Sequence, residues 1–124
     1  MNRPTAAITA VHGVVPEKVL SNKDLEKMVD TNDEWIVSRT GIKERRIVED
    51  GQTLSDMGSD IVKEICKKRG ISPLEIDMVI VGTVTADHRF PSASNIICDK
   101  SGAKNAWGFD LSAACSGFIY TLVT

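Results

Sequence analysis

The sequence has few of the residues from which metal sites are built. Its 124 residues include two histidines and three cysteines. The cysteines, Cys66, Cys98 and Cys115, are too widely spaced to form a C-x-x-C or a Cys/His ligand set. We therefore expect no metal site. An odd number of scattered thiols favours a reducing compartment, so the expected location is cytoplasmic.

Charge of one sign and long apolar runs are also lacking. Lys and Arg number 15 against 17 Asp and Glu, which gives a net charge of −2. This balance argues against a nucleic-acid partner and against an acidic tail. Residues 1–16 lack the apolar core of a signal peptide, and no apolar run is long enough to span a membrane. We predict an ordinary soluble protein without a membrane partner.

Strand signals occur in four places. Residues 6–16 are rich in β-branched side chains and end in Gly and Pro, which predicts a first strand. Residues 42–48 combine apolar ends with a charged centre and predict an exposed strand. Residues 77–85 form a nearly continuous apolar run, as expected of a parallel strand covered on both faces. Residues 105–113 predict another buried strand.

A capping box predicts the first helix. Ser21 and Asp24 have the required spacing, and the apolar residues that follow, Leu25, Met28 and Val29, fall on one helical face. We therefore expect a helix that continues as far as Val29.

Two further helices are bounded by start and stop signals. Thr31 and Glu34 repeat the capping-box spacing, and the helix they begin should end at Gly41. The helix over residues 53–69 has the clearest apolar stripe, basic residues in its last turn, and Gly70 at its end.

The remaining signals complete a layered α/β pattern. Residues 91–102 predict a short helix that ends at Gly102, and residues 115–124 open a last helix without a stop signal. We therefore expect the chain to end inside this helix, as part of a longer protein. The predicted order is β-α-α-β-α-β-α-β-α, which is typical of an α/β layered fold.

The stretch DLSAACSGF, residues 110–118, raises the main question about chemistry. Cys115 follows a predicted strand and begins a predicted helix, where backbone amides and the helix dipole stabilise a thiolate and an oxyanion. Small neighbours would let a substrate carbonyl approach. A free cysteine equally suits a packed core, so the local pattern leaves both interpretations open. Cys66 and Cys98 lie in apolar patterns and are predicted to be structural.

Three segments together identify a family resemblance. DLEKMVDTNDEWIVSRTGIKERRI over residues 24–47, FPSAS over 90–94 and FDLSAACSGF over 109–118 closely resemble β-ketoacyl-acyl carrier protein synthase III. The resemblance implies an acyltransferase that initiates bacterial fatty-acid synthesis. It also implies a thiolase-like fold with α-β-α-β-α layers, in which residues 1–124 form most of the N-terminal half.

The resemblance also implies roles for particular residues. Cys115 matches the cysteine that takes a short acyl group, such as acetyl, from coenzyme A before decarboxylative condensation with malonyl-acyl carrier protein. Trp35 matches the tryptophan that stacks on the adenine, and Arg39 matches an arginine that contacts the phosphates. Thr31 and Thr40 resemble residues near the coenzyme site. Without the resemblance, Trp35 would be read as core packing, Arg39 as a surface ion pair and Thr31 as a helix cap.

Other implied features concern assembly and missing groups. Phe90 matches a phenylalanine that crosses a homodimer interface to line the partner's acyl pocket; alternatively it packs as a loop aromatic on its own subunit. The family's catalytic histidine and asparagine belong to its second half, and neither His12 nor His88 matches them. Acyl-CoA is expected as substrate, with no separate cofactor. The chain alone is expected to be inactive in condensation and to lack a stable fold, because half of the layered thiolase core would be open to water.

Two alternatives remain open at this point. Related condensing enzymes that make polyketide or quinolone starters, or hydroxymethylglutaryl-CoA, also place a cysteine at this position, although DEWIVSRTGI favours the fatty-acid enzyme. The other alternative is a non-catalytic thiolase-like half that dimerises or assembles with a second chain.

Overall fold

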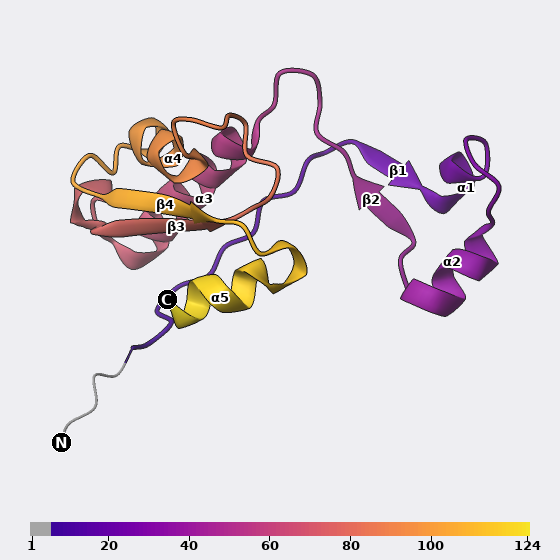
Figure 1. The fold of residues 1–124 in the computed structure, drawn as a ribbon, viewed down its shortest axis with the longest axis horizontal. Helices are drawn as coiled ribbons and strands as arrows, with labels where there is room; N and C mark the ends of the chain where they lie inside the picture. The colour runs from indigo at the N-terminus through magenta and orange to yellow at the C-terminus, as the bar shows by residue number, and fades with distance from the viewer. Residues whose placement is uncertain (1–5) are drawn as a thin grey trace. The chain divides into compact units, whose positions relative to one another are not determined.

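The computed structural model describes residues 6–124, which divide into two compact units (Figure 1). Unit 1 comprises residues 6–14 and 53–124, and unit 2 comprises residues 15–52. The described elements follow the order β-α-α-β-α-β-α-β-α, with two short 3-10 turns added; this is the predicted series, but its first strand lies at other residues than predicted. The α/β class is therefore confirmed.

Unit 2 contains a small antiparallel hairpin and two short helices. Strands β1 (Val19–Ser21) and β2 (Glu44–Arg46) pair with Val19 opposite Arg46. Helix α1 (Asn22–Leu25) starts at the predicted Ser21–Asp24 capping box, and helix α2 (Asp33–Thr40) follows it. Strand β2 lies within the predicted exposed strand.

The centre of unit 2 is a polar side chain. Asn22 is 1% exposed, and its amide nitrogen donates to Asp33 Oδ1 at 2.7 Å and to the Ile42 carbonyl at 2.8 Å. Its amide oxygen accepts from Arg45, and its backbone N–H donates to the Lys43 carbonyl at 3.1 Å. One buried amide thus connects α1, the first residue of α2 and the start of β2.

Unit 1 is a layered α/β body. Helix α3 (Leu54–Arg69) and the turn η1 (Pro73–Glu75) precede strand β3 (Met78–Gly82), helix α4 (Ala93–Ser101) and strand β4 (Trp107–Leu111). The turn η2 (Ala114–Ser116) leads into helix α5 (Gly117–Val123). Strands β3 and β4 are parallel, as predicted. In Figure 1, α4 and α5 lie on opposite sides of this strand pair.

Small residues allow the layers of unit 1 to approach closely. A Cβ on Gly108 would lie 2.4 Å from the Val79 carbonyl oxygen and 2.9 Å from Ser94 Cβ, so α4 crosses β4 where a side chain does not fit. A Cβ on Gly58 of α3 would lie 2.4 Å from Ile97 Cδ1 of α4. The buried side chains of unit 1 are Ser55, Ser59, Cys66, Ala93, Ser94, Ile97, Cys98, Ser101 and Ala103.

The predicted strand over residues 6–16 is wrong. These residues belong to no strand ladder, and Ile8 and Val11 are 70% and 72% exposed. Strand formation depends on a partner that supplies hydrogen bonds, which a local pattern cannot guarantee. The first strand within residues 6–124 is instead β1, which the sequence pattern did not indicate.

Two details of unit 2 also differ from expectation. Helix α1 ends at Leu25, and Met28 and Val29 are exposed because no apolar surface covers that side of the turn. The N-cap of α2 is Asn32, whose side chain accepts from the Trp35 N–H at 2.8 Å, and so the cap predicted at Thr31 is wrong. Asn is as strong an N-cap as Ser and better than Thr.

The predicted helix ends are confirmed. Gly41, Gly70 and Gly102 end α2, α3 and α4 in the left-handed conformation, with φ of 70°, 66° and 84°. The expectation that both faces of the parallel strands are covered is met only in part, because a helix lies on each side but no residue of β3 or β4 is fully buried. These strands are half-buried between α4 and α5.

Candidate active site

Cys115 lies in the short turn η2, between the end of β4 and the start of α5. We predicted it at the first turn of the helix, but α5 begins at Gly117, because the Ser116 N–H bonds to the Ala113 carbonyl at 2.9 Å in a 3-10 turn. Ala114 has a φ of +44°. A non-glycine residue in this region carries strain of about 1–3 kcal/mol, and such strain concentrates at functional sites.

The start of α5 rests directly on the end of β3. A Cβ on Gly82 would lie 3.1 Å from the Gly117 carbonyl carbon and 3.3 Å from Thr121 Cγ2. The two glycines therefore let the helix backbone approach the strand, which fixes the turn that carries Cys115 beside the carboxyl ends of β3 and β4. In open α/β sheets, ligands bind at this edge.

The three cysteines occupy different environments. Cys66 and Cys98 are buried, and burial raises the pKa of both thiols, so they remain protonated at neutral pH. Their predicted structural role is confirmed. Cys115 is exposed, so the alternative in which it fills the core does not apply to it. Its exposure is what a nucleophile needs to reach a substrate.

Phe90 lies in the loop between β3 and α4 and is 89% exposed. Within residues 6–124 its ring packs on no other side chain to any large extent, and its role at a homodimer interface stays a prediction. The loop is fixed by carboxylates that the sequence pattern did not reveal. Asp87 accepts from the Leu54 and Ser55 N–H groups, both at 2.9 Å, and Asp110 accepts from the N–H groups of Ala93 and Ser94 at 2.7 and 2.8 Å.

The charge of Asp87 is stabilised by these contacts. Burial raises the pKa of its carboxyl group, but hydrogen bonds from Ser55 and Leu54 lower the pKa by more than burial raises it. The pKa of Asp87 therefore lies below its usual value. Asp87 and Asp110 line a pocket of about 480 Å³ at the carboxyl edge of the strands. Its full lining is Thr83, Val84, Ala86, Asp87, His88, Arg89, Asp110 and Ser112.

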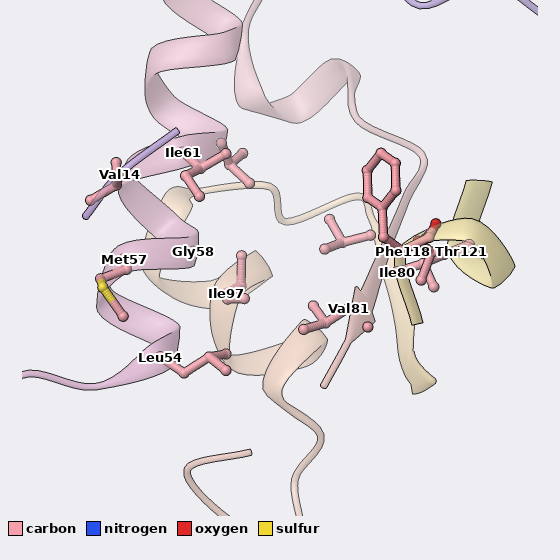
Figure 2. A pocket seen from close by; sticks show the side chains of 13 residues that line it. Val14, Leu54, Met57, Gly58, Ile61, Ile80, Val81, Ile97, Phe118 and Thr121 are labelled. Carbon is pink, nitrogen blue, oxygen red and sulfur yellow. Dashed lines mark hydrogen bonds between the residues drawn. The ribbon is translucent and has the colours of Figure 1, made fainter. Parts of the chain in front are cut away.

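A larger apolar pocket of about 570 Å³ lies between α3, β3 and α5 (Figure 2). Leu54, Met57 and Ile61 of α3 face it, together with Ile97 of α4 and the side chains of β3. Phe118 and Thr121 of α5, three and six residues after Cys115, complete the lining. None of the site residues predicted from the sequence lies in this pocket.

In unit 2, the structure brings together two of the residues predicted to bind coenzyme A. Trp35 is 54% exposed, and the guanidinium carbon of Arg39 lies 5.0 Å from the centre of its ring. This cation–π pair leaves much of the indole accessible, so Trp35 does not belong to the core of unit 2. Within residues 6–124, no carboxylate forms an ion pair with Arg39.

The two threonines differ in their surroundings. Thr31 lines a pocket of about 240 Å³ together with Asp30, Asn32 and Trp35. The Thr40 hydroxyl donates to the Ile36 carbonyl at 2.7 Å and accepts from the Ile42 N–H at 3.1 Å. Both of these hydrogen bonds are to backbone groups at the end of α2. Trp35, Arg39, Thr31 and Thr40 all belong to unit 2, whereas Cys115 and Phe90 belong to unit 1.

Residues 6–124 contain no group of three or more His, Cys, Asp or Glu side chains placed to hold a metal ion. No helix in the same part of the chain combines the length and apolar character that crossing a membrane requires.

Known proteins match the chain throughout. The β-ketoacyl-[acyl-carrier-protein] synthase III 2 of Bacteroides thetaiotaomicron is 51% identical over 125 residues, which cover 100% of this chain and 37% of the relative. The crystal structure of 3-oxoacyl-[acyl-carrier-protein] synthase III from Aquifex aeolicus VF5 is 49% identical with a TM-score of 0.83, over 88% of this chain and 35% of that one. A scan against protein-family models finds no match.

The priming β-ketosynthase of the R1128 polyketide pathway is also similar. It is 42% identical, with a TM-score of 0.82, over 88% of this chain and 33% of that one. The fold that these solved structures share with the chain is that of the thiolase-like condensing enzymes. Within that class, the chain belongs to the β-ketoacyl-acyl carrier protein synthase III family. It spans about a third of the length of the relatives it matches.

Proposed function

We propose that the chain is the part of a β-ketoacyl-acyl carrier protein synthase III that carries the acyl-accepting thiol. The Cys115 thiolate attacks the thioester carbonyl of an acyl-CoA, forming a new carbon–sulfur bond. The tetrahedral intermediate collapses, the bond to the coenzyme A sulfur breaks, and coenzyme A leaves as a thiolate that takes up a proton. The observation that carries this proposal is the exposure of Cys115 in a strained turn at the carboxyl edge of two parallel strands.

The second step is condensation with malonyl-acyl carrier protein. Loss of carbon dioxide from the malonyl group leaves an enolate, whose carbon attacks the acyl carbonyl on Cys115. The Cys115 thiolate is released and 3-oxoacyl-acyl carrier protein is formed. The histidine and asparagine expected for this step match no position in this sequence, so we expect the 124-residue chain to be inactive in condensation by itself.

The coenzyme site is proposed on α2. Trp35 offers an exposed aromatic face to the adenine, and Arg39 offers a guanidinium group to the phosphates. Thr31 lines the pocket beside Trp35 and would contact the coenzyme, while Thr40 would contribute mainly by ending α2. The exposed Phe90 is proposed to enter the acyl pocket of a second subunit in a homodimer.

The second candidate function is priming of a polyketide. It is favoured by one observation, the 42% identity with the priming β-ketosynthase of the R1128 pathway over most of the chain. Both candidates use Cys115 in the same acyl transfer. They differ in the carrier protein that accepts the acyl group, so condensation measured with carrier proteins of each kind would separate them. A non-catalytic half, the third possibility, would form no acyl-enzyme with either.

The acyl transfer is tested with radiolabelled acetyl-CoA, using the chain alone and the complete protein that contains it. We expect label on Cys115, and its loss on the order of a thousandfold or more in Cys115→Ala. Cys98→Ala is the control, because this buried thiol should not affect where the label is found. Equal labelling of Cys115→Ala and the unaltered protein would contradict the assignment. So would the absence of label from the complete protein.

A second arm of the same experiment concerns coenzyme binding. Trp35→Ala should raise the acetyl-CoA concentration for half-maximal labelling about tenfold, the effect of losing one base–aromatic stack. Trp107→Ala is a matched control, because Trp107 is also a largely exposed indole, 60% exposed, but lies on β4. Equal effects of the two substitutions would refute the proposed role of Trp35.

A further inference from the structure

The loop over residues 83–92, which connects β3 to α4, holds Phe90 with almost no help from side-chain packing. The Phe90 side chain is 89% exposed, so contacts of its ring contribute little to its position. The direction in which the ring projects is therefore set by the backbone of the loop. Whatever fixes that backbone also fixes Phe90.

Asp87 fixes the loop on one side of Phe90. Its Oδ1 and Oδ2 atoms accept from the backbone N–H groups of Leu54 and Ser55, each at 2.9 Å. These are the first two residues of α3, whose amides have no partner within the helix. Both oxygens of the Asp87 carboxylate are thus bonded to a rigid element distant in sequence, three residues before Phe90.

Asp110 fixes the loop on the other side. Its two oxygens accept from the N–H groups of Ala93 and Ser94 at 2.7 and 2.8 Å, at the start of α4. Asp110 belongs to β4, the strand that continues into the turn of Cys115. The segment that carries Phe90 is therefore held at both of its ends by the same interaction, a carboxylate that accepts from the first two backbone N–H groups of a helix.

We propose that Asp87 and Asp110 are positioning residues that determine which acyl groups are accepted, by fixing the direction in which Phe90 projects. This inference rests on the proposed function, in which Phe90 lines an acyl pocket. In this proposal the two carboxylates act through the backbone amides that they accept from, one on each oxygen, and not on the substrate. Their effect on the reaction passes through the loop backbone and the Phe90 ring.

Asp87→Asn is the variant that tests this most directly. An asparagine has a single acceptor oxygen, and its amide group would face one of the two N–H donors of α3. The substitution therefore removes at least one anchor of the loop while it preserves the size of the side chain.

The matched control is Asp56→Asn, at the same end of α3. The Oδ2 atom of Asp56 accepts from the Thr53 N–H at 3.0 Å and from the Thr53 hydroxyl at 2.6 Å. Asp56 thus stabilises the same helix terminus without bonding to the loop that carries Phe90. A purely structural role of Asp87 would make the two variants behave alike.

The measurement is the ratio of kcat/KM for acetyl-CoA to that for a branched acyl-CoA, in the complete protein. We expect Asp87→Asn to change this ratio about tenfold, comparable to the discrimination that one methylene group gives in an apolar pocket. Asp56→Asn should leave it unchanged. In a Phe90→Ala background, Asp87→Asn should have no further effect on the ratio, because both changes act through one ring. An unchanged ratio in Asp87→Asn, or equal changes in both Asp variants, would overturn the proposal.

Backbone hydrogen exchange separates this proposal from the function on which it rests. Asp87→Asn should speed exchange in the loop over residues 83–92, and Asp56→Asn should not. If the unaltered protein forms no acyl-enzyme, the proposed function fails, and the exchange rates still decide whether Asp87 fixes the loop. Unchanged exchange in Asp87→Asn would overturn the anchoring itself.

Discussion

In unit 1 most of the buried side chains are small, whereas in unit 2 the most buried side chain is the larger polar residue Asn22. Glycine, alanine and serine let the layers of unit 1 approach closely, as where Gly108 of β4 faces Ser94 of α4. In unit 2 the corresponding place is taken by Asn22, which bonds to Asp33, Ile42 and Arg45. Each unit carries a different part of the proposed site.

The difference concerns what each unit can tolerate. Close packing is disrupted by added atoms, since the neighbouring backbone has to move to make room. A buried hydrogen-bonded amide is disrupted by removed atoms, since its partners are left without hydrogen bonds away from water. Opposite kinds of substitution should therefore be most harmful in the two units.

The largest expected effect on stability is that of Gly108→Ala in unit 1. The added methyl group would lie 2.4 Å from a backbone oxygen, which cannot rotate away as a side chain can. We expect a loss of about 3 kcal/mol in the free energy of unfolding. Gly13→Ala is the control, because a Cβ there meets nothing within 4 Å. Equal denaturation midpoints for Gly108→Ala and Gly13→Ala would contradict the expectation that unit 1 does not tolerate added atoms.

The next effect is that of Asn22→Ala in unit 2. Removing the amide leaves the Arg45 guanidinium, the Asp33 carboxylate and the Ile42 carbonyl without their partner, at a cost of about 2 kcal/mol. Native-state hydrogen exchange should show this loss of stability as faster exchange of the backbone amides of residues 15–52. Lys23→Ala, a truncation of the exposed neighbouring residue, serves as the reference. An Asn22→Ala variant as protected as this reference would show that the polar centre is dispensable.

The smallest effect is a pH dependence shared by the two units. The pKa of Asp56 is lowered to about 2 by hydrogen bonds from Lys100 and Thr53, and that of Asp24 is lowered to about 2 by hydrogen bonds from Ser21 and Lys27. A pKa lowered by folding contributes stability above the ordinary value near 3.8, and that stability is lost as pH falls toward 2.

Thermal unfolding of the Asp56→Asn and Asp24→Asn variants should therefore approach that of the unaltered chain as pH falls from 4 to 2. Both carboxylates are substantially exposed, so the differences are expected to be modest. A gap between variant and unaltered chain that widens with acid would contradict the sign of these shifts.

Features that depend on near neighbours in sequence could be predicted. The capping pair Ser21 and Asp24 and the terminal glycines of α2, α3 and α4 act within a single turn, so the local pattern contains all the information needed. From the first helix onward, the element order followed from these boundaries. The site residues of the proposed function came from the family resemblance, because the local chemistry of Cys115 left two interpretations open.

Features that depend on distant partners could not be predicted. Asp87 bonds to residues 33 and 32 positions away, and Arg45 reaches Asn22 across 23 positions. Nothing in the local pattern distinguishes these side chains from ordinary surface carboxylates and cations. The strand expected over residues 6–16 failed for the same reason, since its β-branched side chains suit a strand but residues 6–16 pair with no strand in the described part of the chain.

The unequal exposure of the three cysteines has a practical consequence. Two thiols are enclosed and held protonated by burial, and one is open to solvent. Alkylation of the folded chain should therefore stop at one thiol per molecule, whereas the unfolded chain should take up three, so the stoichiometry reports folding without any cysteine having to be removed.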